Sequence, residues 1–474
     1  MKLRALLLFF SLFLLQALQS QPLQKNRLIV LTDIENEPDD SESMVRLLLY
    51  SNQIDIEGII ATTSCWFRNR VAPESIRSTI MAYEKVYPNL VRHEPGFPEP
   101  SELLSKVKQG LPVYGMGAVG DGKDSEGSEW IISVLEKNDE RPVYVSVWGG
   151  ANTLAQALYK IRKTKSKADA ERLVSKLRVY TISDQDDTGI WMRNNFPGLF
   201  YIVTPGDYYA GATWSGINTV IRGIDNSEIS NSWLAENIQT GHGPLGLCYP
   251  DVAWGMEGDT PSYLWVIPNG LNEPEHPDWG GWGGRYELYK PDFSKQRKGD
   301  SGVPSEPETR AIWTNAEDSY NPYVPNEYGR VVKRDSVTIK SHHATLMRWR
   351  KEFQNDFAAR MDWTVKSYEE ANHPPVPALA HSDRLTVKSG ERFYLDATGT
   401  KDPDNDHLSY LWFHYPEPGS YKKLISITPE NTYNVFITAP RVEKPETAHF
   451  ILMVTDKGEP RLTRYKRIIV TILP

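Results

Sequence analysis

Short hydrophobic runs alternate with amphipathic stretches from residue 27 to about residue 270. Residues 28–31 are all apolar, which is typical of a strand buried on both faces. Residues 41–50 place apolar side chains at helical spacing, and residues 56–61 return to a strand pattern. The same order recurs in residues 143–147, 153–163 and 177–182. The pattern predicts an α/β fold with a mostly parallel, Rossmann-like sheet and helices on both faces, and such sheets bind ligands at the carboxyl ends of their strands.

The pattern changes in the second half of the chain. Residues 272–330 are rich in Gly, Pro, Trp and Tyr, and residues 341–365 predict one long helix. A proline-rich stretch at 374–377 is typical of an interdomain linker with few contacts across it. Short alternating runs follow and predict strands at 392–395, 408–414, 433–437, 450–454 and 466–472. We therefore expect one domain over 21–372, with an extension from about 270, and an all-β immunoglobulin-like sandwich over 373–474.

The first residues have the layout of a secretory signal. Lys2 and Arg4 precede the apolar run 5–15, and residues 16–21 are polar or small. We expect cleavage after about residue 20 and a secreted or periplasmic protein. The apolar run is too short for a membrane span.

Composition narrows the class of partner. The formal net charge of −8 is spread along the 474 residues, which argues against binding a nucleic acid polymer through its phosphates. Cys65 and Cys248 are the two cysteines, and their spacing leaves a disulfide open.

Carboxylates are concentrated where the first predicted strand ends. Asp33 follows that strand directly, and Asp39 and Asp40 stand at the start of the next helix. An acidic helix N-terminus also suits the helix dipole. However, carboxylates this dense repel one another without a cation, and oxygen ligands select Ca²⁺ or Mg²⁺. The sequence therefore favours a metal site at this position.

Four ordered segments resemble the nucleoside hydrolase superfamily. They are the aspartates with the helix and residues 57–63 that follow, the stretch 145–155, the Ser183–Asp187 segment and residues 257–262. The similarity spans residues 27–290 and is greatest to a secreted branch with a C-terminal sandwich, some of whose members are labelled cellulose-binding. It implies a Ca²⁺-dependent hydrolase of furanosides.

The resemblance also implies roles for individual residues. Asp33 would be the general base for a calcium-bound water and would also contact the metal. The other metal ligands would be Asp40, Asp259 and the backbone carbonyl of Asn152, and Asp39 would accept hydrogen bonds from the sugar. Further substrate contacts would come from Ser64, Trp66, Asp184, Gln185 and Glu257.

Two departures leave the substrate open. The loop that carries Glu35 and Glu37 is longer than is usual in the family, and Gly258 stands where a histidine often protonates the leaving base. Glu257 is the neighbouring candidate for that role. The bond cleaved could be an N-ribosyl bond or the bond of an O-linked furanoside. The alternative hypothesis is a non-catalytic protein that binds a polysaccharide such as cellulose.

The C-terminal segment has features of its own. Residues 395–412 resemble PKD-type immunoglobulin-like modules of secreted enzymes. Their Asp402, Asp404 and Asp406 form either an Asx turn or a cation site. Trp279 and Trp282 are candidates for a sugar platform or for packing against glycine backbone.

Overall fold

The computed structural model describes residues 24–222, 224–295, 302–325, 331–334 and 337–474. The expected signal segment lies outside these residues. Within them, no helix combines the length and the apolar character that crossing a membrane requires.

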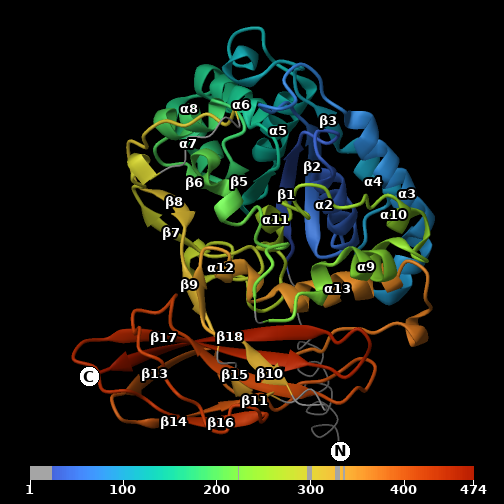
Figure 1. The fold of residues 1–474 in the computed structure, drawn as a ribbon. Helices are drawn as coiled ribbons and strands as arrows, with labels where there is room; N and C mark the ends of the chain where they lie inside the picture. The colour runs from blue at the N-terminus through green and yellow to red at the C-terminus, as the bar shows by residue number, and fades with distance from the viewer. Residues whose placement is uncertain (1–23, 223, 296–301, 326–330, 335–336) are drawn as a thin grey trace, which may run out of the picture.

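An eight-stranded sheet forms the centre of the larger domain (Figure 1). Its strand order is β3-β2-β1-β4-β5-β6-β8-β7, and all neighbours are parallel except β7 and β8. The strands are β1 (Asn26–Thr32), β2 (Ile54–Ala61), β3 (Val107–Gln109), β4 (Val143–Val147), β5 (Leu177–Ser183), β6 (Phe200–Thr204), β7 (Tyr286–Tyr289) and β8 (Ile312–Asn315). The prediction of a mostly parallel α/β sheet is confirmed.

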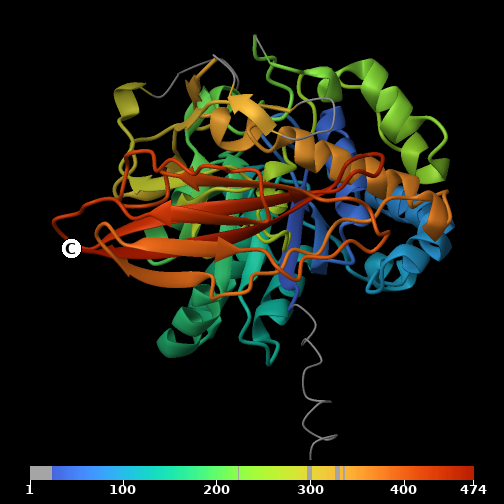
Figure 2. The same cartoon turned by 90° about the horizontal axis from the view of Figure 1, so that it is seen from below.

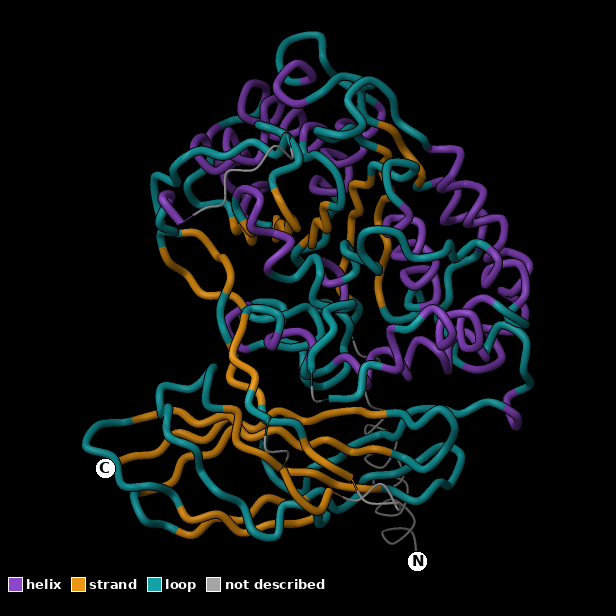
Figure 3. Tube along the Cα trace, viewed as in Figure 1, coloured by secondary structure: helices purple, strands orange, loops and turns teal. Residues whose placement is uncertain are grey.

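Helices cover both faces of this sheet, as the tube in Figure 3 shows. The helices are α2 (Pro38–Leu49), α3 (Pro73–His93), α4 (Pro100–Ser105), α5 (Glu126–Glu136), α6 (Asn152–Thr164), α7 (Lys167–Ser175), α8 (Thr188–Asn195), α9 (Asn231–Leu234), α10 (Gly243–Leu247), α11 (Pro261–Leu264), α12 (Ala344–Met347) and α13 (Arg350–Asp362). Helices α2, α3 and α13 contribute to one buried cluster, and α5 and α6 to the other.

Strand β1 shows how the sequence pattern produces this layering. Leu28 and Val30 pack into the cluster with α2, whereas Ile29 and Leu31 pack into the cluster with α5 and α6. Successive side chains of a strand point to opposite faces, so an uninterrupted apolar run requires cover on both sides. Because β1 pairs with β2 on one side and with β4 on the other, its carboxyl end lies where the strand order reverses, the usual ligand crevice of such sheets.

The segment after residue 270 differs from the sequence-based prediction. It supplies β7 and β8 to the main sheet. The expected long helix over 341–365 is wrong, because two helices, α12 and α13, are separated at Arg348 and Trp349. The short strands β9 (Asp318–Tyr320), β10 (Tyr323–Pro325), β11 (Val331–Arg334) and β12 (Ile339–Ser341) precede them.

The C-terminal region is all-β. A four-stranded sheet, β13-β18-β17-β15, and a strand pair, β14-β16, enclose a core around Trp412. The strands are β13 (Arg384–Lys388), β14 (Arg392–Asp396), β15 (Ser409–Tyr415), β16 (Asn434–Thr438), β17 (Glu446–Thr455) and β18 (Thr463–Leu473). The five predicted strands are present, and β13 was not predicted.

The two domains share one hydrophobic core, so the expectation of few contacts between them is wrong. Phe413, Tyr415 and Tyr465 of the β domain belong to the same buried cluster as Trp282 and Trp349. Seen from below, the four-stranded sheet runs across the base of the α/β domain (Figure 2). The proline-rich linker therefore joins domains that are tightly packed.

Polar contacts reinforce this interface. The buried Arg467 guanidinium donates hydrogen bonds to the carbonyls of Leu271 and Gly280, at 2.9 and 2.8 Å. Arg464 pairs with Asp356 of α13 at 2.5 Å. These bonds satisfy charged groups that would otherwise be buried without partners.

Candidate functional site

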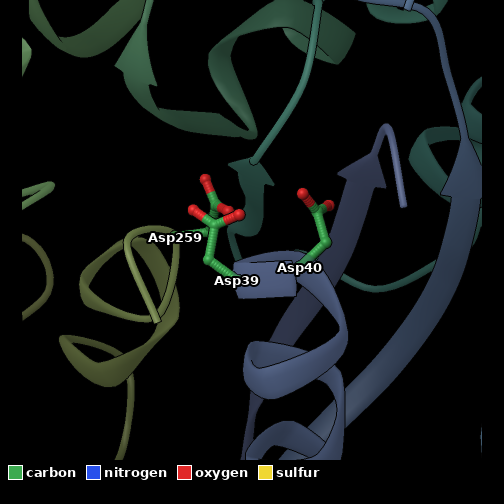
Figure 4. Close-up of side chains that lie close together, drawn as sticks. All are labelled: Asp39, Asp40 and Asp259. Carbon is green, nitrogen blue, oxygen red and sulfur yellow. The ribbon is translucent and has the colours of Figure 1, made fainter. Parts of the chain in front are cut away.

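Three aspartates meet at the carboxyl edge of the main sheet. Asp39 and Asp40 project from the first turn of α2, and Asp259 comes from the loop before α11 (Figure 4). One oxygen of each carboxylate lies within 4.8 Å of one oxygen of the other two, and all three residues are buried. We call Asp39, Asp40 and Asp259 the aspartate cluster.

The local sequence explains this placement. Strand β1 ends at Thr32, and Pro38 occupies the start of α2, where its missing N–H costs nothing. The loop between them turns through Glu35, which has a positive φ of 84°. Asp39 and Asp40, which follow Pro38, lie in the first turn of α2, beside the end of β1.

Burial makes this cluster electrostatically costly. Burial raises the pKa of Asp39 to about 7; the charge of Glu37 adds to the rise, and the hydrogen bond from Trp214 opposes it. The pKa values of Asp40 and Asp259 are well above their usual range, first through burial and then through the other carboxylates. A divalent cation would relieve this repulsion.

Asp33 lies next to the cluster. Burial raises the pKa of Asp33 to about 7, the neighbouring Ser64 hydroxyl lowers it, and the charge of Asp39 raises it further. A Cβ added to Gly149 would lie 2.7 Å from Asp33 Oδ1, so the loop before α6 packs directly against this carboxylate. Asp33 thus faces the β4–α6 loop and the cluster together.

Unpartnered oxygens show that the site fits a cation. Asp33 Oδ2 and Asp259 Oδ1 are buried and have no hydrogen-bond donor among the described residues. Buried polar atoms nearly always have a partner, and a metal ion would provide one here. A donor set of carboxylate oxygens is the kind that Ca²⁺ and Mg²⁺ prefer.

The loop between β1 and α2 carries two additional glutamates, and only one of them lies near the site. Glu35 points away from the cluster, pairing with Arg70 at 3.3 Å and with the Ser75 hydroxyl. Glu37 is half-buried, and its negative charge raises the pKa of the four buried aspartates, Asp33, Asp39, Asp40 and Asp259. Of the two additional glutamates, Glu37 is the one placed to influence the site.

Asn152 is the first residue of α6, and the use of its backbone carbonyl as a metal ligand stays a prediction. Its side-chain amide donates to Thr63 Oγ1 and to the Val113 carbonyl, both at 2.8 Å, and its Oδ1 accepts from Thr62 at 2.7 Å. Its backbone carbonyl lies in the first turn of α6, where a helix carbonyl accepts a bond from the N–H four residues later. The side chain of Asn152 therefore links the loops around the site, and its backbone N–H donates to Asp186 Oδ2 at 3.1 Å.

The segment after β5 is structural where a substrate contact was expected. Asp184 is buried in a two-pronged ion pair with Arg193, at 2.9 and 2.7 Å, and Arg193 also pairs with Glu308. The carboxylate of Asp184 is thus already neutralised. Gln185 donates to the Trp148 carbonyl, while its Oε1 is buried and has no donor among the described residues.

Glu257 is also held by partners within the protein. It is fully buried, forms an ion pair with Arg46 at 2.5 Å, and accepts bonds from Tyr249 and Thr260, both at 2.9 Å. The Arg46 guanidinium and the two hydroxyl groups together occupy both oxygens of this carboxylate. The suggestion that Glu257 contacts substrate or protonates a leaving group is therefore corrected.

Sequence reasoning missed Trp214. Its indole Nε1 donates to Asp39 Oδ2 at 3.1 Å, although 175 residues separate the two in the chain. The segment 206–216 combines glycines and aromatics, as sugar-binding loops do, but nothing in it indicates contact with Asp39. Trp66 lies at the rim with 37% of its surface exposed, and Ser64 is buried beside Asp33.

The other candidates from the sequence are two tryptophans, the aspartates of the β domain and the two cysteines. Trp282 is fully buried at the domain interface, and Trp279 stacks on His276 with ring centroids 3.9 Å apart. Asp402 Oδ1 accepts the N–H groups of Asp404 and Asp406, both at 2.9 Å, which is the Asx-turn arrangement. One oxygen of each of the three carboxylates also lies within 4.8 Å of one oxygen of the other two, so the geometry is compatible with the cation site as well. Cys65 and Cys248 are free thiols.

Family models match both domains. Residues 27–286 match the model described as "Cellulose-binding Sde182, nucleoside hydrolase-like domain", and residues 392–472 match "Cellulose-binding protein Sde0182, C-terminal domain". No curated protein matches the chain.

One solved structure is similar over nearly the whole chain. It is a nucleoside hydrolase-related hypothetical protein from Saccharophagus degradans, described as associated with carbohydrate metabolism. The two are 36% identical, with 95% of this chain and all of that chain covered and a TM-score of 0.79.

Two other solved structures share too little for comparison. The bacteriophage RB49 outer capsid protein Hoc is 14% identical over 21% of this chain and 30% of its own, with a TM-score of 0.15. The effector XOO4466 is 11% identical over 62% of this chain and 88% of its own, with a TM-score of 0.28. The first family model covers more than half of the chain, and the chain therefore belongs to the Sde182 family with a nucleoside hydrolase-like domain.

Proposed function

We propose that the protein is a secreted, calcium-dependent hydrolase that cleaves the anomeric bond of a furanoside. The observation that carries this proposal is the pairing of Asp33, with its unpartnered buried oxygen, and the adjacent aspartate cluster. A base beside a cation site at the carboxyl edge of a parallel sheet is an arrangement suited to activating water. The relative named for carbohydrate metabolism supports a sugar substrate.

Each residue has a part in this reaction. Asp40 and Asp259 would hold the cation, and calcium would supply positive charge that favours ionised carboxylates and orients sugar hydroxyls. Asp33 accepts a proton from the attacking water, and its environment holds its pKa near the working pH of a general base. Asp39 accepts hydrogen bonds from the sugar through the oxygen not bonded to Trp214.

The type of leaving group depends on whether the site can protonate it. Glu257, the candidate proton donor beside Gly258, is held in an ion pair with Arg46. N-ribosyl bonds with a basic leaving group depend more on protonation than O-linked furanosides that carry a good leaving group. Both bond types therefore belong in the assay.

Non-catalytic polysaccharide binding is the second candidate, and the description of the matching family as cellulose-binding favours it. Binding alone gives no reason to bury Asp33 with an unpartnered oxygen beside three other carboxylates. We also propose that the C-terminal β domain is an immunoglobulin-like module.

The test is turnover of p-nitrophenyl α-L-arabinofuranoside, p-nitrophenyl β-D-ribofuranoside and uridine, with Ca²⁺ or with a chelator. Asp33→Asn should lower kcat on the order of 100-fold while calcium binding, measured by calorimetry, is retained. Glu35→Gln is the matched control, because this carboxylate in the same loop faces Arg70, and it should keep full activity. Full activity of Asp33→Asn would exclude the mechanism, and sugar binding without any turnover by the wild type would favour the binding protein.

A further inference from the structure

Trp214 is seated beside the aspartate cluster by its surroundings. A Cβ added to Gly258 would lie 2.2 Å from the indole Nε1, and one added to Gly255 would lie 2.8 Å from Cζ2. Neither glycine could carry a side chain without displacing the ring. The two glycines and the hydrogen bond to Asp39 together fix the indole at the edge of the cluster.

Two further aromatic rings extend from Trp214 to the surface. Tyr209 contacts Trp214 edge-on, with centroids 5.6 Å apart, and Trp66 contacts Tyr209 at 6.3 Å. Trp214 and Tyr209 are half-buried, and Trp66 is exposed over 37% of its surface. We call these three residues the aromatic row. It leads from a buried carboxylate to solvent and keeps exposed ring surface along the way.

The angles between the rings favour a sugar chain over a nucleobase. Flat bases stack on aromatic faces and are held best between near-parallel rings. Neighbouring rings in the row are turned by 80° and 62°, so adjacent faces do not form a flat slot. The C–H faces of successive sugars in an oligosaccharide point in different directions, and rings at varied angles suit them.

We propose that the aromatic row binds the sugar units next to the bond to be cleaved, so that the substrate is an O-linked furanosyl oligosaccharide rather than a nucleoside. This inference rests on the proposed hydrolase function and names its substrate class. It assigns Trp214 and Tyr209 to the inner sugar position and Trp66 to an outer one.

The experiment measures binding by calorimetry in full-length Asp33→Asn protein with Ca²⁺, which separates recognition from turnover. The probes are α-1,5-arabinotriose, cellotriose, arabinose and uridine. Arabinotriose should bind more tightly than cellotriose, arabinose and uridine. Trp66→Ala should weaken trisaccharide binding by about ten-fold and leave arabinose binding unchanged, because the outer ring meets only the longer ligand.

A matched control comes from the β domain. Tyr394 and Phe436 form an exposed aromatic pair on β14 and β16, with centroids 4.7 Å apart, and Tyr394→Ala should leave trisaccharide binding unchanged. Trp214→Phe, which keeps an aromatic ring but loses the bond to Asp39, should weaken binding of both trisaccharide and arabinose.

The outcomes are distinct. The proposal is overturned if arabinotriose does not bind, if cellotriose or uridine binds more tightly than arabinotriose, or if Trp66→Ala does not reduce arabinotriose binding. Loss of trisaccharide affinity in Trp66→Ala, together with no turnover of arabinotriose by the wild type, would support the aromatic row and reject the hydrolase. Binding and turnover therefore fail separately.

Discussion

Asp259→Asn should change the stability of the protein in opposite directions with and without calcium. The Asp259 carboxyl lies within 4.8 Å of those of Asp39 and Asp40, and burial and these charges raise its pKa. Without a cation, the amide removes one of several mutually repelling charges. With calcium, the same change removes a ligand.

The magnitude follows from the geometry. Two like charges 4.8 Å apart repel by about 3.5 kcal/mol at an effective dielectric constant of 20. Partial protonation of these carboxyl groups, whose pKa values are raised, relieves much of this repulsion. In chelator at pH 8, Asp259→Asn should therefore be more stable than the wild type by about 1–3 kcal/mol. Calcium at 100 times its Kd should add about 2.7 kcal/mol to the wild type and much less to the variant.

The pH dependence has a definite sign. Asp33 and Asp39 have pKa values near 7 in the folded protein and an ordinary value of 3.8, so folding favours their protonated forms. Their stability contribution is complete below pH 3.8 and is lost as pH rises through 7. Each of these two shifts, from 3.8 to about 7, corresponds to about 4 kcal/mol, so the metal-free wild type should lose on the order of 4–8 kcal/mol between pH 4 and pH 8 from Asp33 and Asp39. Calcium should remove most of that loss.

Urea denaturation at several pH values, with chelator or calcium, measures all of these differences. Asp186→Asn is the control, because Asp186 is buried with a pKa near 7 but accepts its bonds from Thr188 and Asn152 outside the cluster. In Asp186→Asn, calcium should raise the free energy of unfolding by as much as it does in the wild type. A metal-free wild type whose stability did not fall as pH rose, or an Asp259→Asn variant that gained as much from calcium, would refute the reasoning.

Two other predictions concern packing. A chain ending at residue 372 should aggregate, as judged by light scattering, because it exposes Trp282 and Trp349; a soluble monomeric product would contradict the shared core. Arg46→Met should lower the free energy of unfolding by about 3–5 kcal/mol, because Glu257 is left as a buried unpaired charge. Adding Glu257→Gln should restore part of this loss in urea denaturation, and a single variant as stable as the wild type would show that the pair is not needed.

The features that depend on local sequence were predictable. The apolar run at 28–31, Asp33 after it and the paired aspartates before a helix define a strand end and a helix start within 13 residues. The topology then placed them at the ligand-binding edge, as expected from strand–helix alternation. The five predicted strands of the β domain follow equally local alternation.

Features set by distant partners were not predictable. From the sequence, Asp184 and Glu257 are expected to be free carboxylates. Nothing in the sequence indicates that Arg193 pairs with Asp184 and Glu308, or that Arg46 pairs with Glu257. Trp214 reaches Asp39 only because Gly255 and Gly258 leave room for its ring. Charge neutralisation and empty volume are properties of the folded packing, and a single sequence does not encode them at neighbouring positions.

The single core that joins the two domains also constrains the order in which the chain can fold. Trp349, between α12 and α13, is covered by Phe413 and Tyr415 of β15 and by Tyr465 of β18. During synthesis from the N-terminus, the α/β domain therefore keeps an uncovered aromatic surface until β15 and β18 have emerged. Completion of strand β18, rather than formation of the main sheet, would then be the step that commits the molecule to its native state and ends its exposure to chaperones and aggregation.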